Sequence, residues 1–554
     1  MAKRFFILFL FLSPVIIQAQ NEIVPLENPV YFFLKQQHIK GNLPGYDDLI
    51  LPLYRIQVEN LLKSLEENRT SPNTSTDGST EFLQKYFPLK SQQNKGVFSG
   101  DKIPFYSVLY ESEENHFYKY SDTVLNFIFD PRAALKSIKS NNSGRDSVSG
   151  VMQYGAKFIL NYGDFLAVEM DAWNGNVYNS RSPAREIREV AQSLTFNKTG
   201  LKNFDGTSGY AHFGQEHLNI HFGRNRLIWG TGIQHKLILS NNPQIFDYLN
   251  LDFKYNKFRY TFLHGWLTEK VTETMPDSLN ILKVKQPKYI AVSRLGYNPS
   301  GSFKVGISQI VIYGDRPFEA AYMNPFLFWE SAQRSMNDID NSFLSLDMRW
   351  ILTPGLELSS SLMLDDIHFG NYFIEGLDSR SNRSALQAGL SVTDPLFFKG
   401  YTFSFEYTMI RPYTFSHPGY GGTTTYTNNG YNLGAEIEPN SVVLDANLKG
   451  FVLPRLLCEI GFRFTEHGAN VTDSAGNLIR NFGGDINHSY DYSTPVSTPL
   501  LDGELELTRT AYCKIEYFIS YNLSFTSLVR FTRFTSDINK STSTFLFSLS
   551  YGFL

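Results

Sequence analysis

The sequence is poor in the features that mark disulfide-linked, zinc-binding or nucleic-acid-binding proteins. Its 554 residues include two cysteines, Cys458 and Cys513, which provide neither a disulfide framework nor a zinc ligand set. Charged residues make up 19% of the chain and the formal net charge is -4, which argues against the basic surface of a nucleic-acid binder. After residue 20, no apolar run approaches the roughly 20 residues that a membrane-spanning helix needs. A soluble secreted protein and a membrane β-barrel remain as alternatives.

Aromatic residues, by contrast, are abundant. The chain holds 46 Phe and 32 Tyr, and aromatic residues amount to 15% of the total. In transmembrane barrels, aromatic side chains gather at both membrane interfaces, while the strands carry apolar residues outward and polar residues inward. The composition therefore favours a barrel over a soluble enzyme.

The first 20 residues have the pattern of a secretory signal peptide. Lys3 and Arg4 form the charged start, an apolar stretch follows, and Ala19 suits the cleavage position. An uncleaved anchor is the alternative, but the apolar run is short for a spanning helix. No cysteine precedes Cys458, which excludes a lipoprotein anchor on an N-terminal cysteine. We expect an exported protein of the outer membrane.

The segment that follows has helical character. Tyr31 and Leu34 keep helical spacing, and the Gly-Asn-Leu-Pro-Gly stretch at 41–45 ends the run. Pro52 suits the first turn of a second helix. We therefore predict a small α-helical segment over residues 21–115, on the periplasmic side.

From residue 116 to residue 554 the apolar period changes to two. The last ten residues are an example, in which one set of larger apolar side chains alternates with Leu546, Ser548, Ser550 and Gly552; that set is Phe545, Phe547, Leu549, Tyr551 and Phe553. Strands of about ten residues with this alternation are typical of transmembrane barrels. The pattern predicts an all-β, antiparallel transmembrane β-barrel over residues 116–554.

The connections between these strands alternate between short and long. Outer-membrane barrels have short periplasmic turns, longer external loops and an even number of strands. Counting back from Leu554 as a periplasmic end gives about 18 strands. The long and therefore external connections include 174–205, 224–244, 314–341, 412–441 and 467–502.

With this topology, the chain resembles the Wzi-type capsule-assembly outer-membrane proteins in their Bacteroidetes-like form. The resemblance spans nearly the whole mature chain. It implies a monomeric barrel with a periplasmic helical segment, which acts as a surface lectin holding capsular or extracellular polysaccharide. Outer-membrane lipid and, during insertion, the barrel-assembly machinery are the other partners that we expect. The motifs that carry it are Tyr31-Phe32-Phe33-Leu34, Gly41-Asn42-Leu43-Pro44, Pro52-Leu53-Tyr54-Arg55, Phe222-Gly223-Arg224, Trp229-Gly230-Thr231-Gly232, Leu239-Ser240-Asn241-Asn242-Pro243, Tyr322-Met323-Asn324-Pro325 and Leu362-Met363-Leu364-Asp365-Asp366.

Two groups of residues have the chemistry for glycan binding on the predicted outer side. Aromatic faces stack on sugar rings, carboxylates and amides bind hydroxyls, and Arg pairs a uronate carboxylate in bidentate fashion. The alternative for each charged residue is an ion pair in a polar lumen, or a loop that folds into the mouth as a plug. For tyrosines the alternative is an aromatic belt at the membrane interface. The candidates are Arg224, Arg226, Trp229, Asp315, Arg316, Asn324, Trp329, Glu330, Arg334, Asp365 and Asp366, with Tyr420 and Tyr426 in the Tyr-rich loop 412–441.

The sequence gives little support for catalysis. Asp365 and Asp366 are adjacent, so on a strand they point to opposite faces and make a poor acid/base pair. His217 and His221 lie four apart, share a strand face without being neighbours, and would need further ligands to bind a metal. We predict no catalytic residue, metal or cofactor. A diffusion channel and, less favoured, an outer-membrane acyl hydrolase remain as alternative functions.

Overall fold

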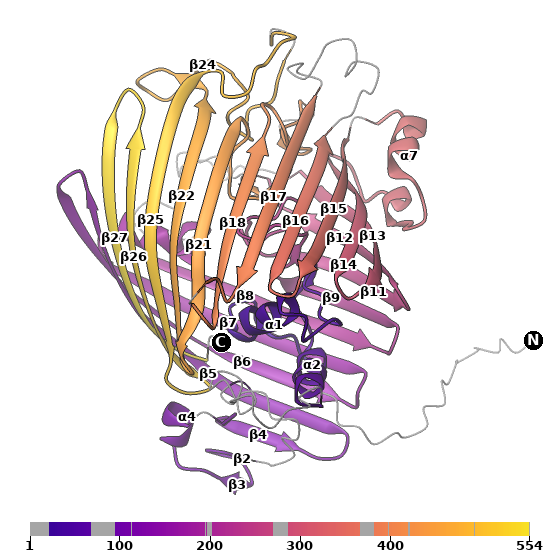
Figure 1. The fold of residues 1–554 in the computed structure, drawn as a ribbon, viewed down its shortest axis with the longest axis vertical. Helices are drawn as coiled ribbons and strands as arrows, with labels where there is room; N and C mark the ends of the chain where they lie inside the picture. Colours follow the sequence, from indigo (N-terminus) through magenta and orange to yellow (C-terminus); the bar gives the residue numbers. More distant parts are fainter. Residues whose placement is uncertain are drawn as a thin grey trace, which may run out of the picture.

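Long antiparallel strands close into a barrel in the computed structural model of the chain (Figure 1). The structure describes residues 21–67, 83, 95–111, 113–193, 196, 202–269, 286–338, 340–365, 382–396, 398–418, 422–491 and 494–552.

The 18 strands of the closed sheet follow one another around the barrel in chain order. They are β5 (Leu125–Asn142), β6 (Arg145–Tyr162), β7 (Leu166–Asn179), β8 (Asn203–Gly214), β9 (Leu218–Asn225), β11 (Phe246–Tyr255), β12 (Phe258–Leu267), β13 (Lys288–Ser300), β14 (Phe303–Gly314), β15 (Asn341–Thr353), β16 (Leu356–Asp365), β17 (Arg383–Thr393), β18 (Tyr401–Ile410), β21 (Ser441–Leu453), β22 (Leu456–Ala469), β25 (Glu504–Phe518), β26 (Leu523–Thr535) and β27 (Asn539–Tyr551).

Short strands and helices complete the described structure. The short strands are β1 (Ile50–Leu51), β2 (Lys95–Gly96), β3 (Asp101–Lys102), β4 (Tyr118–Ser121), β10 (Ile228–Trp229), β19 (Thr427–Asn428), β20 (Tyr431–Asn432), β23 (Val471–Thr472) and β24 (Leu478–Arg480). The helices are α1 (Val30–Ile39), α2 (Arg55–Glu67), α4 (Ser107–Tyr110), η1 (Pro183–Glu186), α5 (Arg188–Ala191), η2 (Ala320–Met323) and α7 (Trp329–Met336). None of these helices is long and apolar enough to cross a membrane.

The predicted barrel class and strand number are confirmed. The alternation that predicted them is visible on β16, where Glu357, Ser361 and Asp365 are buried toward the lumen and their neighbours are more exposed. On β27, Phe547 and Leu549 are exposed on the outer wall, as the period of two requires. The alternation of side chains thus gives each strand one face toward the lumen and one face toward lipid.

The barrel closes between β27 and β5, and the short strand β4 is added at this seam. Strand β5 pairs with β27 along its upper part, from Ala133 to Asn142, and with the short strand β4 along its lower part. The reason is length, because β5 has 18 residues whereas β27 has 13. The lower end of β5 therefore extends past β27, and β4 covers the edge left open there.

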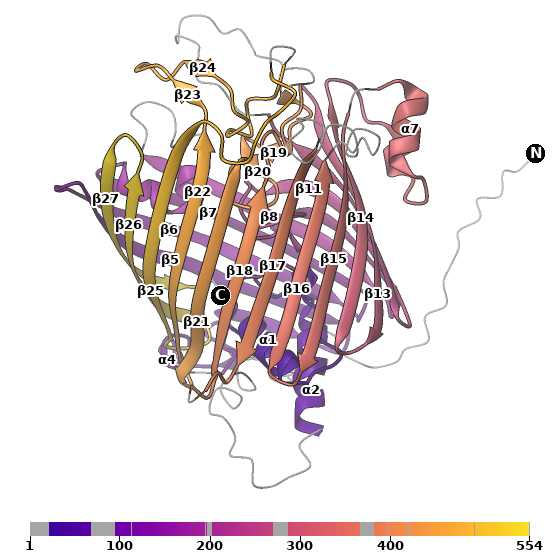
Figure 2. The ribbon, with the colours of Figure 1, turned by 45° about the horizontal axis from the view of Figure 1, so that its top comes forward.

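Short turns such as 163–165, 256–257, 354–355 and 454–455 lie together at one end of the barrel. Because outer-membrane barrels turn tightly on the periplasmic side, this end is the periplasmic one. The long connections, including β23 and β24, lie at the opposite end (Figure 2).

Helices α1 and α2 lie at the periplasmic opening of the lumen (Figures 1 and 2). They share one buried apolar cluster with the barrel, in which Phe33 and Val58 pack with Leu457 of β22 and Phe518 of β25. The helices bury their apolar sides against the inner wall, and residues 21–67 are part of the barrel's own core. The boundary between segments near residue 115 stays a prediction.

Ion pairs fix the N-terminal segment to several strands of the inner wall. Lys35 Nζ lies 2.7 Å from a Glu357 carboxylate oxygen, and Arg259 Nη1 lies 2.8 Å from Asp47 Oδ2. Arg349 of β15 pairs with Asp48. These buried charges are partnered across the lumen, as the cost of burying them requires.

Besides the connection that carries η1 and α5, two long connections fold inward from the extracellular end. Residues 226–245 and the described residues of 411–440 contribute Trp229, Phe415 and Tyr426 to one large buried cluster with the strands β11 to β18 and β21. Glu406 of β18 holds the first of these loops, because its carboxylate accepts the backbone N–H groups of residues 233–235. The described part of the lumen is therefore filled from both ends.

Candidate functional site

A cavity of about 450 Å³ remains in the lumen beside the wall formed by β5 to β8 and β25 to β27. Its floor is the N-terminal segment around Ile23–Glu27, and its roof is the inward connection that carries η1 and α5. The wall residues reach the cavity because they occupy the inward positions of their strands. They include Arg132, Lys136, Lys157, Glu169, Asp171, Trp173, Ser208, Ser548 and Ser550.

Trp173 of β7 is the aromatic surface of this cavity. Its ring lies against Gly206 of β8, where an added Cβ would come within 2.4 Å of the ring atoms. Only glycine leaves room there for the indole to lie so close to the sheet. The guanidinium carbon of Arg132 lies 5.7 Å from the ring centroid. The indole N–H is buried against Gly206, and no described residue accepts a hydrogen bond from it.

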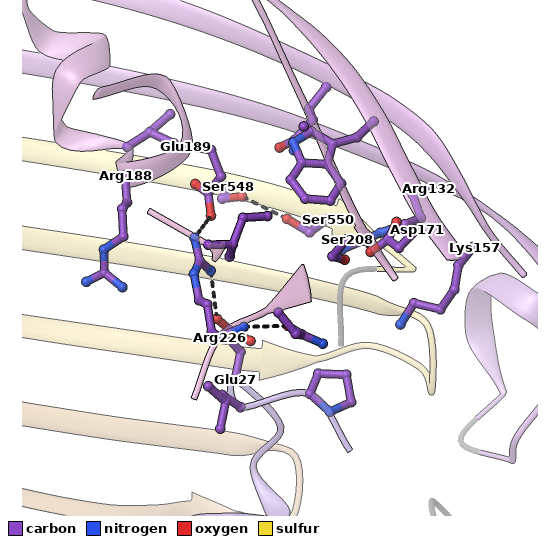
Figure 3. A pocket seen from close by; sticks show the side chains of 18 of the residues that line it. Glu27, Arg132, Lys157, Asp171, Arg188, Glu189, Ser208, Arg226, Ser548 and Ser550 are labelled. Carbon is purple, nitrogen blue, oxygen red and sulfur yellow. Dashed lines mark hydrogen bonds and ion pairs between the residues drawn. The ribbon is translucent and has the colours of Figure 1, made fainter. Parts of the chain in front are cut away.

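Charged pairs line the rest of this cavity. Arg226 lies between Glu27 and Glu189, with nitrogen–oxygen distances of 3.4 Å and 3.1 Å (Figure 3). Arg132 pairs with Asp171 on the neighbouring wall. Burial alone would raise the pKa of the Glu189 carboxyl, but the charges of Arg226 and Lys136 outweigh it and lower that pKa to about 2. Glu189 is therefore ionised at neutral pH.

A second cavity, of about 430 Å³, lies on the extracellular side of the first. The two share Glu186, Arg188 and Gln192 in their linings, so the α5 connection separates them. Arg188 Nη1 donates to the carbonyl of Asn241 at 2.6 Å, and Glu186 pairs with Arg530 of β26. The second cavity lies toward the external loops, and the α5 connection stands between it and Trp173.

This arrangement is suited to a polar ligand with ring faces and many hydroxyl groups. Small-molecule sites are concave, with a few convergent polar groups that fix orientation. Here guanidinium, carboxylate and hydroxyl groups surround one aromatic face. No group of three or more His, Cys, Asp or Glu side chains in the described parts of the chain is arranged to hold a metal ion.

Of the residues predicted from the sequence, Arg226 lines the cavity. Four others are fully buried elsewhere and offer a glycan no free face: Trp229, Trp329, Asp365 and Tyr426. Trp229 packs in the apolar cluster of the inward loops, Tyr426 donates to the carbonyl of Ile238, and Asp365 Oδ2 accepts the backbone N–H of Phe415 at 2.6 Å. Asp365 thus has the plug-forming role that was its alternative. Tyr426 and Trp229 also pack in the plug, and Tyr426 does not lie in the aromatic belt that was its alternative.

The remaining described candidates lie outside the lumen. Arg224 pairs with Asp247 at 2.6 Å, and both side chains are exposed on the outer wall near the extracellular rim. The connection between β14 and β15, whose helix α7 lies beside the outer wall, carries Asp315, Arg316, Asn324, Glu330 and Arg334 as well as the buried Trp329. Asp366 and Tyr420 lie outside the described residues. A glycan-binding role for the exposed residues stays a prediction.

Sequence reasoning missed most of the cavity. Arg132, Lys157 and Glu169 stand at inward positions of strands otherwise rich in apolar residues, and this spacing was the available signal. Nothing in the sequence distinguishes a charged residue that lines a cavity from one that pairs with the plug. That distinction depends on which loops fill the lumen.

The histidines of β8 and β9 are packed among aromatic rings. His212 stacks on Tyr54 at 3.7 Å between centroids, and His221 stacks on Tyr248 at 5.3 Å. The Nε2 atom of His212 contacts Asn219 Oδ1 and that of His221 contacts the Tyr248 hydroxyl. These contacts give both rings a structural role beside the N-terminal segment.

Comparisons with known proteins agree with this architecture. No curated protein sequence matches the chain. Among solved structures, the chain is similar to Wzi, an outer-membrane protein involved in group 1 capsule assembly in Escherichia coli and a carbohydrate-binding β-barrel. The TM-score is 0.55 and the identity 10%, over 95% of this chain and 98% of the other.

Two further barrels match less well. OprD of Pseudomonas aeruginosa has a TM-score of 0.42 and 11% identity, over 77% of this chain and 96% of its own. OccAB4 of Acinetobacter baumannii has a TM-score of 0.43 and 9% identity, over 76% and 97%. Both scores are too low to bear on function.

The sequence family described as capsule assembly protein Wzi matches residues 136–483, which is more than half of the chain. This range covers part of β5, the strands from β6 to β22 and the three inward connections. The chain belongs to the Wzi family of capsule-assembly proteins and forms an outer-membrane β-barrel.

Proposed function

We propose that this barrel is a non-enzymatic lectin that binds capsular or extracellular polysaccharide in its luminal cavity and helps to assemble or attach the capsule. The observation that carries the proposal is Trp173, a partly buried aromatic face in a luminal cavity that paired charges also line. The solved Wzi barrel is carbohydrate-binding, which supports the same class of ligand.

The cavity's side chains match the groups of a sugar. An indole face offers the flat apolar surface against which a pyranose ring packs. Glu27 and Glu189 can accept hydrogen bonds from sugar hydroxyls, while Arg226 and Arg188 can donate to hydroxyl or carboxylate oxygens. The serine hydroxyls of Ser548 and Ser550, 3.0 Å apart, do both.

A long polymer adds avidity to weak single contacts. Once one repeat unit is held, the next binds at a high effective concentration, so modest sites suffice. Exposed residues near the extracellular rim, such as Arg224 and Asp315, would then contact further units outside the lumen. We further propose that the protein is a monomer. Its signal peptide directs export and is then cleaved, and the barrel-assembly machinery inserts the barrel into the outer membrane.

The two rival functions have distinct signatures. A diffusion channel needs an open lumen, whereas here the inward loops and N-terminal helices pack into it. A steady open pore in planar bilayers would favour the channel. An acyl hydrolase would turn over lipid and lose this activity when a histidine is replaced.

The location of the binding site is tested by a matched pair of arginine variants. Arg188→Gln removes a positive charge where the two cavities meet, so we expect affinity for acidic polysaccharides to fall about tenfold, with neutral ones little changed. Arg334→Gln removes the same charge from the outer wall and should leave binding intact. Purified proteins on an array of bacterial polysaccharides provide the measurement.

The array has two outcomes that count against the proposal. Binding that Arg334→Gln weakens and Arg188→Gln leaves unchanged would move the site to the external segment. Binding to no acidic or neutral polysaccharide would overturn the lectin function itself.

A further inference from the structure

The connection between β14 and β15 leaves the extracellular rim and lies on the outer wall of the barrel, where α7 is seen beside the strands (Figures 1 and 2). We call residues 315–338 the wall segment. The other described long connections cited above fold into the lumen or remain over the mouth, so this one needs its own explanation.

Apolar contacts dock the wall segment onto the sheet. Tyr322 and Trp329 pack in one buried cluster with Phe262, Val311 and Tyr313. The strand residues of this cluster alternate with others, such as Leu263, Ile310 and Ile312, that belong to the luminal cluster. Since successive residues of a strand face opposite sides, the segment covers the outer face.

Polar contacts complete the docking. Gln309 of β14 donates to the carbonyl of Leu327 at 2.9 Å and accepts the backbone N–H of Trp329 at 3.2 Å. The Tyr260 hydroxyl bonds to Ser293 Oγ at 2.6 Å and to the carbonyl of Pro325 at 2.5 Å. The outer wall thus carries polar side chains here, and the segment satisfies them.

The register places this docking site directly above the lipid-facing belt. Ile307, two residues below Gln309 on β14, stands opposite Leu295 on β13 and Leu346 on β15. These three side chains are 53%, 45% and 50% exposed on the outer wall, so they form a row that faces lipid. The chain from Pro325 to Trp329 therefore lies at the upper edge of that row.

The tip of the segment presents apolar side chains outward. Phe326 is 90% exposed and Phe328 is 53% exposed, and the Phe326 ring stacks on Tyr260 at 6.2 Å between centroids. Behind the tip, the outer side of α7 is polar, with the exposed residues Ser331, Arg334 and Ser335. A polar helix with an apolar tip, continuous with a lipid-facing surface, matches a segment that lies in a membrane interface.

We propose that the tip of the wall segment, residues 324–328, inserts among the acyl chains of the outer leaflet and forms a lipid-binding surface. Phe326, Leu327 and Phe328 extend the belt of Leu295, Ile307 and Leu346 outward, while α7 remains at headgroup level. This inference rests on the barrel's place in the outer membrane and is independent of the proposed glycan site.

Lipid contact is tested by single cysteines carrying an environment-sensitive fluorophore. Phe326→Cys is made in a Cys458→Ser/Cys513→Ser background and reconstituted in phosphatidylcholine vesicles, with or without brominated acyl chains. We expect brominated lipid to quench the probe at 326 as strongly as at Ile307→Cys on the belt. The probe at Ile479→Cys, in the external strand β24, should be quenched by aqueous iodide instead.

Phe328→Cys provides a second labelling position, which is used if the fluorophore at position 326 disturbs the wall segment. Quenching of 326 and 328 by brominated lipid, with protection from iodide, supports the proposal. Iodide quenching equal to that at 479, with no effect of brominated lipid at either position, overturns it. A failure of glycan binding would leave this result unchanged.

Discussion

Replacing Arg294 by methionine is expected to lower the free energy of unfolding of the barrel by about 3–5 kcal/mol, because it leaves a buried carboxylate without its partner. Arg294 of β13 and Asp347 of β15 are fully buried in the lumen and joined by contacts of 2.5 Å and 3.2 Å. The pair bridges across β14, where Gly306 makes room for the guanidinium. Urea unfolding in lipid vesicles measures the change. It is monitored by the loss of the band of folded barrel in gel electrophoresis of unheated samples.

The double variant Arg294→Met/Asp347→Leu is the control for this pair. Removing both charges removes the unpaired carboxylate, and replacing a whole buried ion pair by apolar residues is often neutral or stabilising. We therefore expect the double variant to recover most of the stability lost in Arg294→Met. Equal losses in both variants would mean that the packing of the Arg294 side chain, rather than its charge, stabilises this wall.

Replacing Trp173 by alanine is expected to weaken polysaccharide binding by about 30-fold, or about 2 kcal/mol, the scale of a buried aromatic hot spot. The indole is the aromatic face of the luminal cavity, and its N–H has no partner among the described residues. Stability should change less than binding, because the side chain is only partly buried. Isothermal titration with oligosaccharides from the capsule measures the affinity.

Trp350→Ala is the matched control for Trp173→Ala. Trp350 lies on the outer face of β15 beside Phe303, near the periplasmic end, and it is far from the cavity lining. We expect its replacement to leave affinity unchanged. If both variants bind as the unaltered protein does, the aromatic face of the cavity has no part in recognition.

The barrel could be predicted from the sequence because a strand in a membrane wall has a strict period of two. The alternation at Phe547 and Leu549 gave the outward face, and the alternation of short and long connections gave the strand number and orientation. The short strand β4 was not anticipated, since it depends on how far β5 extends past β27.

The paths of the connections could not be predicted, because a loop has no period that fixes its direction. Residues 226–245 turn inward because Glu406, far away in the sequence, accepts three of their backbone N–H groups. Residues 315–338 turn outward because Gln309 and Tyr260 bind them on the outer wall. For the same reason, Arg226 is the only one of the described sequence candidates that lines the cavity.

The central claim is that polysaccharide binds inside the lumen, next to Trp173. A crystal structure of the barrel with an oligosaccharide from its own capsule tests this most directly. We predict a sugar ring packed on the Trp173 indole, with hydroxyl or carboxylate groups bonded to Glu189 and Arg226. Oligosaccharide seen only on the outer wall or external loops, with the luminal cavity empty at a saturating concentration, would contradict the claim.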